Sequence, residues 1–290
     1  MFYSKLYRRV NLRQLGGTGR MVIEGTIPEA VWTEACANLN ELDLSFSKVE
    51  VDGYKVGGYF RICNAILEDS DIDLAAELLD VLSRAIGYAL DKAIIYGTGT
   101  KMPLGIVTRL AQTEQPENYP LTARPWANLS ATNIVSVTAA NSTGVKLFQN
   151  ILKGFGAAKS KYSRGVKFWA MNEATYTTMM AEALSINASG AVVSGMQNTM
   201  PVIGGAIEIL DFIPDNNIVA GYGDLYLLAE RAGMSLATSE HVRFVEDQTV
   251  FKGTARYDGK PAIAEAFVVF AINGATATTS MAFAQDKANG

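Results

Sequence analysis

Residues 70–105 read SDIDLAAELLDVLSRAIGYALDKAIIYGTGTKMPLG. Ser70 or Asp71 can accept hydrogen bonds from the backbone N–H groups that begin a helix, and the first strong stop signal after them is Gly97-Thr98-Gly99. Between these signals apolar residues recur at three- and four-residue spacing, which is typical of a helix with one packed face: Leu74, Leu78, Leu82, Ala85, Ala89 and Ala93. The stretch therefore predicts a helix over residues 71–97, of which residues 72–96 alone would span about 37 Å at roughly 1.5 Å per residue.

Four short motifs, the end of this helix among them, carry a resemblance to a known family. The helix ends in LDKAIIYGTG (residues 90–99) followed by PLGI (103–106), and LDLSFSK (42–48) precedes it. Downstream lie FWAMNEAT (168–175) and RYDG (256–259), the latter followed by Ala266-Phe267. In their order and spacing these motifs resemble those of tailed-phage major capsid proteins of the Hong Kong 97 type, whose long helix is called the spine helix.

This resemblance implies a domain organisation as well as a fold. The order of helix, helix and then mixed strands independently indicates an α+β protein. The resemblance adds an N-terminal arm (1–19), an extended β-hairpin loop (20–57), a peripheral domain (58–165) with the spine helix (71–97), an axial domain (166–225), returning strands of the peripheral domain (226–275) and a tail (276–290).

The same resemblance implies a structural role without enzymatic activity. Similar proteins self-assemble, as hexamers and pentamers of identical subunits, into the icosahedral head of a tailed phage or prophage. The implied partners are scaffolding, portal and decoration proteins, together with double-stranded DNA held non-specifically on the inner face of the shell. The implied location is the virion, after assembly in the cytoplasm of a bacterial host and without any membrane contact.

Composition and charge agree with a folded protein of this kind. The chain has 290 residues, 49% of them hydrophobic and 19% charged, which is ample material for a core. The net charge of -4 argues against a dedicated nucleic-acid binder. Residues 1–23 hold five bases and no acid, Lys5, Arg8, Arg9, Arg13 and Arg20, which leaves -4 - 5 = -9 for the remainder.

The basic arm has two interpretations. Arg8, Arg9 and Arg13 could contact DNA inside a shell, or they could contact acidic surfaces of neighbouring subunits. The second is favoured because aromatic and aliphatic side chains are interleaved with the charges and seek apolar contact, although stacking on bases is an alternative. The Gly-rich break at residues 16–19 further suggests that the arm lies on another molecule.

The extended loop carries more apolar surface than a two-stranded ribbon can bury. An isolated hairpin is marginally stable in water, and contiguous apolar patches are rarely left exposed. We therefore expect a neighbouring subunit to cover Val31, Trp32, Leu42, Leu44 and Phe46. The turn over residues 239–248 resembles the loop that the family places near local threefold contacts, which makes Glu246 and Asp247 candidate contact charges.

Local signals predict further elements. Asp52-Gly53 and Asp258-Gly259 are hairpin-turn signals, and residues 108–141 are expected to form a polar surface excursion. A second helix is expected over 144–162, and a buried strand over 166–171 should precede a helix capped by Asn172 or Thr175. The second helix would be packed through Val145, Phe148, Leu152 and Phe155, and the residues from 275 onward form a loose tail.

Signals for catalysis, cofactors and metals are weak. No phosphate-binding glycine motif is present, no cofactor is expected, and His241 is the sole histidine, so a site built from several histidines in one chain is excluded. A hydrolase using Cys36 and His241 remains the alternative of another class. A nanocompartment shell protein similar to the encapsulins is the alternative within the same fold. A lysine crosslink of the extended loop is not expected, because no lysine occurs between Arg20 and Lys48.

Overall fold

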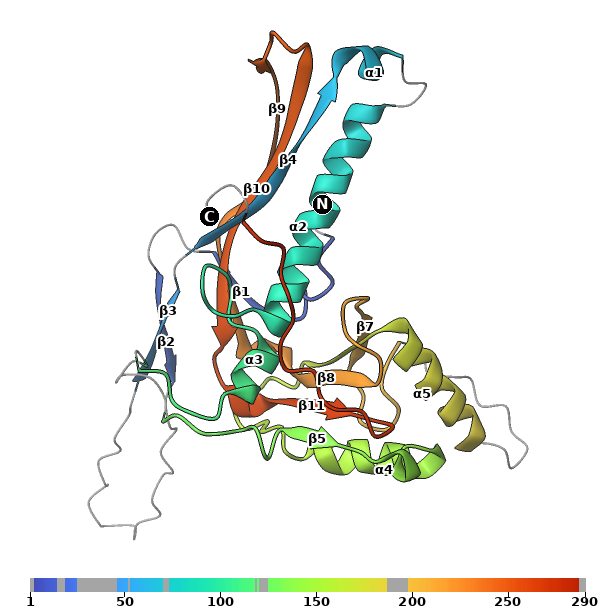
Figure 1. Ribbon diagram of the computed structural model, residues 1–290. Coiled ribbons are helices and arrows are strands. Elements are labelled where there is room, and N and C mark those ends of the chain that lie inside the picture. Colours follow the sequence, from blue (N-terminus) through green and yellow to red (C-terminus); the bar gives the residue numbers. More distant parts are fainter. Residues whose placement is uncertain are drawn as a thin grey trace.

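The computed structural model describes residues 3–14, 19–24, 46–51, 53–69, 73–117, 119, 125–186 and 198–286, with the backbone alone for 19–24, 46–51 and 184–186. Within these ranges the chain forms a four-stranded sheet, a five-stranded sheet and a separate two-stranded ribbon. Helices lie along both larger sheets, and Figure 1 shows the four-stranded sheet standing above the five-stranded one.

The four-stranded sheet has the order β1-β9-β10-β4. Strand β1 (Asn11–Gln14) runs parallel to β9 (Tyr226–Arg243), while β10 (Gln248–Pro261) runs antiparallel to both β9 and β4 (Tyr54–Cys63). We call the three long strands β4, β9 and β10 the blade, because they project together from the body of the molecule (Figure 1). The short helix α1 (Asn64–Glu68) follows β4 at the far end of the blade.

Helix α2 (Leu74–Tyr96) packs along one face of the blade. Side chains of β10 alternate, so that Thr249, Phe251, Ala255 and Tyr257 are buried. A Cβ atom added at Gly253, in the same row, would lie 3.2 Å from the Ile86 side chain of α2. The buried row therefore faces the helix, and the alternate row of β10 faces away from it.

The five-stranded sheet forms most of the core. Its order is β5-β11-β8-β6-β7, and its three middle strands are almost continuously buried, as expected for a sheet covered on both faces. The strands are β5 (Ile134–Ser136), β6 (Lys167–Met171), β7 (Ala206–Ile209), β8 (Asn217–Tyr222) and β11 (Phe267–Ala271). The helices packed around it are α3 (Ile106–Ala111), α4 (Gly144–Phe155) and α5 (Glu173–Ile186).

Short 3-10 turns and the ribbon complete the described chain. The turns are η1 (Ala139–Asn141), η2 (Gly223–Leu225) and η3 (Ala264–Ala266). Strands β2 (Gly19–Glu24) and β3 (Phe46–Val51) pair antiparallel as a ribbon, which confirms the backbone pairing expected at the base of the extended loop. In Figure 1 this ribbon leaves the base of the blade in the direction away from the blade's far end.

The long helix is confirmed, but its cap and its buried stripe differ from the prediction. Asp73 caps it by accepting the backbone N–H of Ala76 over 3.1 Å, and Ser70 and Asp71 lie outside the described residues. Ala85 is exposed and Ala89 only half-buried. Leu82 and Ala93 are buried as predicted. The larger side chains one position after Ala85, Ala89 and Ala93 are buried as well, namely Ile86, Leu90 and Ile94.

Neither Asp-Gly signal closes a hairpin between the described strands, and Asp52 itself lies outside the described residues. Asp258-Gly259 lies inside β10, where Gly259 pairs with Leu228, and the turn between β9 and β10 falls at residues 244–247 instead. Gly53 leads from β3 into β4, but these strands take different partners, β2 and β10. In both places long-range strand pairing decides the backbone path, and a local turn preference of two residues is too weak to oppose it.

Three further expectations require correction. Residues 108–141 are not a surface excursion throughout, because they contribute α3 and β5 to the core. Helix α4 ends at Phe155, and Val145 and Leu152 are exposed while Leu147 and Ile151 are buried. The tail is docked as far as Ala282 and Phe283, since Lys92 donates to the carbonyl of Ala282 over 2.7 Å and lies over the Phe283 ring. By contrast, the strand over 167–171 and the Asn172 cap of α5, at 2.9 Å from Thr175 N, are confirmed.

Candidate subunit-contact surfaces

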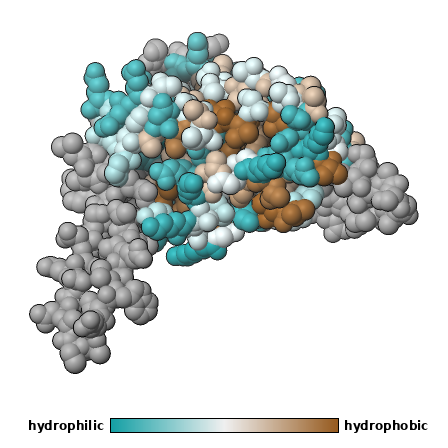
Figure 2. Space-filling view, turned by 90° about the horizontal axis from the view of Figure 1, so that it is seen from below, coloured by the Kyte–Doolittle hydropathy of each residue, from teal (hydrophilic) through white to brown (hydrophobic). Residues whose placement is uncertain are grey.

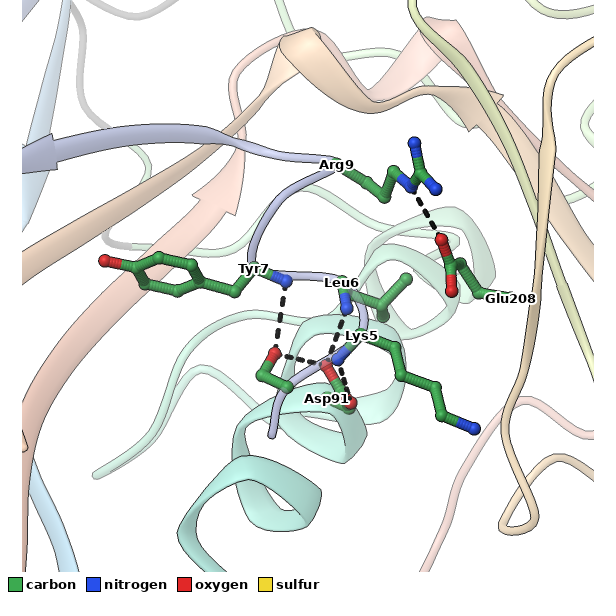
Figure 3. Close-up of polar contacts among 7 residues, drawn as sticks. Lys5, Leu6, Tyr7, Arg9, Asp91 and Glu208 are labelled. Atoms are coloured by element: carbon green, nitrogen blue, oxygen red, sulfur yellow. Dashed lines mark hydrogen bonds and ion pairs between the residues drawn. The ribbon is translucent and has the colours of Figure 1, made fainter. Parts of the chain in front are cut away.

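The N-terminal arm, residues 3–14, is held on its own chain by the carboxylate of Asp91. This residue lies in α2 and is 3% exposed. Its two oxygens accept hydrogen bonds from the Ser4 hydroxyl (2.5 Å), the Lys5 backbone N–H (2.9 Å) and the Leu6 backbone N–H (3.0 Å). Figure 3 shows these contacts converging on one carboxyl group. The expectation that the arm lies on another molecule is therefore wrong for this segment.

Burial and hydrogen bonding act on Asp91 in opposite directions. Burial raises its pKa above the ordinary value of 3.8, and the hydrogen bonds from Ser4, Lys5 and Leu6 oppose that shift without cancelling it. A buried charge of this kind is retained only when its lone pairs are satisfied, and here the arm supplies the donors. Docking of the arm and burial of the charge thus depend on each other.

Side chains of the arm make further contacts within the chain. Tyr7 donates its hydroxyl proton to Glu230 in β9 (2.5 Å), and burial together with this bond raises the pKa of Tyr7. Arg9 contacts Glu208 in β7, with 2.6 Å between Nε and Oε1 (Figure 3). At the start of the arm, Tyr3 bonds to Asp80, which also pairs with Arg84 one helical turn away.

The three predicted arm residues are therefore placed differently from one another. Arg9 is occupied by Glu208, so its charge is compensated within the chain. Arg8 and Arg13 are exposed, and no ion pair among the described residues includes either of them. The structure does not bring the three together as one basic surface.

The predicted loop contacts lie mostly beyond what the structure describes. Val31, Trp32, Leu42 and Leu44 are outside the described residues, and Phe46 is described by its backbone alone, as the first residue of β3 opposite Glu24. Their side-chain contacts with a neighbour therefore remain a prediction.

The outer face of the blade carries a row of positive charges. On β4 and β10 the register pairs Lys55 with Arg256 and Tyr59 with Lys252, and Arg61 follows on the same face opposite Val250. All four cations are exposed and lie in the rows directed away from α2. Like charges on facing strands repel one another, so this face favours an acidic partner.

The far end of the blade, residues 242–247, is apolar at its centre and charged at its rim. Phe244 is 79% exposed and Val245 is 93% exposed. Arg243 pairs with Glu246 over 2.6 Å, and this hydrogen bond lowers the pKa of Glu246. Asp247 accepts from the Asn64 amide over 2.6 Å and adopts φ of 49° to turn the chain. We call this region the blade tip.

The sequence predicted some of the residues at these surfaces and missed others. Glu246 and Asp247 were predicted as contact charges, and both lie at the tip, where they shape the turn through contacts within the chain. Asp91, by contrast, was missed as the group that holds the arm. Its signal was available in the sequence, because an acid on the apolar stripe between Leu90 and Ile94 must find buried donors.

Catalytic and metal-binding groups are not assembled in the described part of the chain. His241 is exposed on β9, and Cys36 falls outside the described residues, so their pairing is not tested. No cluster of three or more His, Cys, Asp or Glu side chains able to hold a metal ion occurs among the described residues. None of the helices in the described ranges combines the length and apolar character that a bilayer-spanning helix needs.

Comparison with known proteins agrees with the geometry of the blade and helix. The model of the phage capsid family matches residues 1–272 of the chain. No curated protein matches the sequence. The long α2, the blade and the ribbon thus occur in a chain that the family model covers almost from end to end.

Solved structures show the same fold at low sequence identity. The capsid of a native GTA particle matches with a TM-score of 0.66 at 16% identity, over 92% of this chain and 89% of that one. A chain from Microbacterium phage Oxtober96 matches with a TM-score of 0.67 at 14% identity, over 93% and 91%. A chain from Mycobacterium phage Bobi matches with a TM-score of 0.69 at 11% identity, over 94% and 91%.

Proposed function

The chain belongs to the phage capsid family and is a structural major capsid protein, and from this we propose that its copies assemble into the closed icosahedral head of a tailed phage or prophage. In this proposal the copies form hexamers and pentamers that enclose double-stranded DNA. The observation that carries it is the family match over residues 1–272. The solved capsids of similar fold support it.

In the assembled shell the extended loop of one subunit would lie on the blade of the next. Between β2 and β3 the sequence holds Glu29, Glu34, Glu41 and Asp43 and no Lys or Arg. The outer face of the blade offers the opposite charge through Lys55, Arg61, Lys252 and Arg256. The ribbon that leads into the loop leaves the base of the blade and points away from the blade's far end (Figure 1). This direction favours contact of the loop with the blade of a second subunit over contact with its own blade.

Apolar residues of the loop would complete the same contact. Val31, Trp32, Leu42, Leu44 and Phe46 bring apolar surface, and exposed Tyr59 on the blade's outer face offers a partner for it. Aromatic anchors surrounded by matched charges are the usual composition of a specific protein interface. Each such contact needs only moderate strength, because every subunit meets several neighbours.

The blade tip would form a second contact between subunits. Phe244 and Val245 are too exposed to contribute to the fold of a single chain, and Glu246 and Asp247 border them. Tips meeting at the corners between capsomers would bury these side chains against their symmetry copies. Scaffolding, portal and decoration proteins belong to the same proposal as further partners, with assembly in the host cytoplasm and the virion as the final location.

Electron microscopy of the purified full-length protein tests the proposal. We expect closed icosahedral shells of uniform diameter, and nuclease-protected DNA in particles taken from infected or induced cells. Small shells filled with a cargo protein and free of DNA would instead assign the chain to the nanocompartment alternative. A protein that stays monomeric at high concentration, with or without a scaffolding partner, would contradict the proposal.

A further inference from the structure

In one region of this acidic protein every charged residue is basic. From residue 118 to residue 172 the sequence contains no Asp or Glu, although the whole chain has more acids than bases. Its charged residues are Arg124, Lys146, Lys153, Lys159, Lys161, Arg164 and Lys167. A run of this length without a single acid concentrates positive potential on the elements that it forms, chiefly α4 and the segment after it.

Helix α4 turns its charges toward solvent. Leu147, Ile151 and Phe155 form the buried stripe, and at 100° per residue Lys146 and Lys153 lie on the opposite side of the helix. Both lysines are exposed, and Gln149 between them is exposed as well. One side of α4 therefore packs on the core while the other presents two ammonium groups about 10 Å apart along the axis.

The segment after α4 extends this basic surface. Lys159, Lys161 and Arg164 are all exposed. Asp224 accepts hydrogen bonds from the Ser163 hydroxyl (2.7 Å) and the Arg164 backbone N–H (2.6 Å), so its carboxylate holds the backbone of this segment. None of the ion pairs among the described residues includes any of these cations.

One of the two acids on the neighbouring helix α5, Glu182, is occupied at the start of α4. Glu182 of α5 accepts the backbone N–H of Gly144 over 2.5 Å, at the N-terminal end of α4. Helix α4 lies at the lower side of Figure 1, and the view from below in Figure 2 shows hydrophilic side chains on both sides of a hydrophobic patch. No ion pair among the described residues joins Lys146 or Lys153 of α4 to an acid, and both side chains are exposed to solvent.

We propose that the exposed face of α4 and the following segment, with Lys146, Lys153, Lys159, Lys161 and Arg164, bind the phosphate backbone of double-stranded DNA. This inference rests on the proposed function, because a shell that encloses DNA supplies the polyanion. Lysines spread over a helix and a loop suit binding without sequence preference, since each ammonium group attracts a phosphate as a point charge. The N-terminal arm is less suited to bind DNA, because Arg9 is already paired with Glu208. The acidic loop of a neighbouring subunit is less suited as the partner of α4, because the proposed contact with the blade would already match its charges.

Binding of a fluorescent 30-base-pair DNA duplex to the full-length unassembled protein tests this inference across a series of salt concentrations. The variant K146Q/K153Q/K159Q removes three charges, and K146R/K153R/K159R keeps them as the matched control. We expect the Gln variant to lose at least about tenfold in affinity at low salt and about 2–3 units in the slope of log K against log salt. The Arg variant and Lys101→Gln, which removes one exposed charge elsewhere, should bind like the wild type.

Several results would overturn the inference. They are a wild-type protein that does not bind the duplex at low salt, a Gln variant that binds as tightly as the wild type, and an Arg variant as weak as the Gln variant. Loss of shell assembly in the Gln variant with unchanged DNA affinity would assign this face to a contact between subunits instead. Shell formation by the wild type, followed separately by microscopy, reports on the proposed function and leaves the DNA result interpretable.

Discussion

The carboxylate of Asp91, in the C-terminal part of α2, accepts the backbone N–H of Leu6 over 3.0 Å across 85 residues of sequence. Leu6 itself is fully buried, so the arm contributes an apolar side chain to the core at the same point where it supplies hydrogen-bond donors to a buried carboxylate. Docking of the arm therefore combines a hydrophobic contact, which has no direction, with hydrogen bonds that fix its register.

Replacing Asp91 should release the arm. In Asp91→Asn an NH2 group replaces one carboxylate oxygen. Because this group donates and cannot accept, at least one of the three hydrogen bonds from the arm is lost. We expect unfolding to become easier by about 1–3 kcal/mol, with hydrogen exchange of residues 3–10 accelerated first. Glu77→Gln, at an exposed position of the same helix, should change stability by less than about 0.5 kcal/mol. Unchanged exchange of the arm in Asp91→Asn would contradict this account.

The pH dependence of stability should reveal the burial of Asp91. Because burial raises its pKa, the folded protein binds more protons than the unfolded protein between the two pKa values, and stability from this group falls as pH rises through the raised value. The contribution is fully present only below the unfolded value near 3.8. Chemical denaturation at several pH values should show that the difference in free energy of unfolding between the wild type and Asp91→Asn grows from pH 7 toward pH 4. A shrinking difference would mean that the hydrogen bonds outweigh burial.

Two adjacent glycines in β4 should respond differently to alanine. A Cβ atom at Gly57 would lie 2.2 Å from the carbonyl oxygen of Gly253 in β10, whereas a Cβ atom at Gly58 meets nothing within 4 Å. We expect Gly57→Ala to lower the free energy of unfolding by about 1–3 kcal/mol because the strands must separate locally. Gly58→Ala should be within about 0.5 kcal/mol of the wild type in the same denaturation experiment. Equal effects would show that β4 and β10 do not approach so closely.

Val202 should be a site where a polar residue stabilises the isolated chain. It is 89% exposed and has φ of 67°, a left-handed conformation that a β-branched residue adopts only with strain. Asparagine tolerates this conformation, so we expect Val202→Asn to raise the melting temperature, in line with a gain of about 0.5–1 kcal/mol. Val245→Asn is the matched control, because Val245 is equally exposed without a positive φ. Stabilisation by both substitutions would point to exposure and not to strain.

Charge reversal should separate the loop–blade contact from folding. Lys252→Glu with Arg256→Glu places negative charge on the blade's outer face, where it would repel the acidic loop of the next subunit, so shells should form poorly while the monomer stays folded. Adding Glu34→Lys and Glu41→Lys should restore assembly, measured as the particle fraction in sedimentation. Assembly of the blade variant at the wild-type level would remove this contact from the proposal.

Several elements could be predicted from the sequence because their signals are local. Helix α2, strand β6 and the Asn172 cap of α5 follow from spacing and capping within about 25 residues of chain, and all three are confirmed. The motifs on these elements also gave the resemblance, and the α+β fold of the Hong Kong 97 type and the family are confirmed. The domain boundaries and the subunit contacts remain proposals.

The tertiary structure decided what depends on partners far apart in the chain. Strand β4 pairs with β10 across nearly two hundred residues, the Lys92 side chain holds the tail at Ala282, and Asp91 takes its donors from the arm. Periodicity and caps determine which residues form a helix or a strand and which face is apolar, because those preferences act between residues a few positions apart. Periodicity and caps do not determine which of these faces pack against one another in the folded protein. That choice follows only when the whole chain buries its core and every buried charge finds its donors.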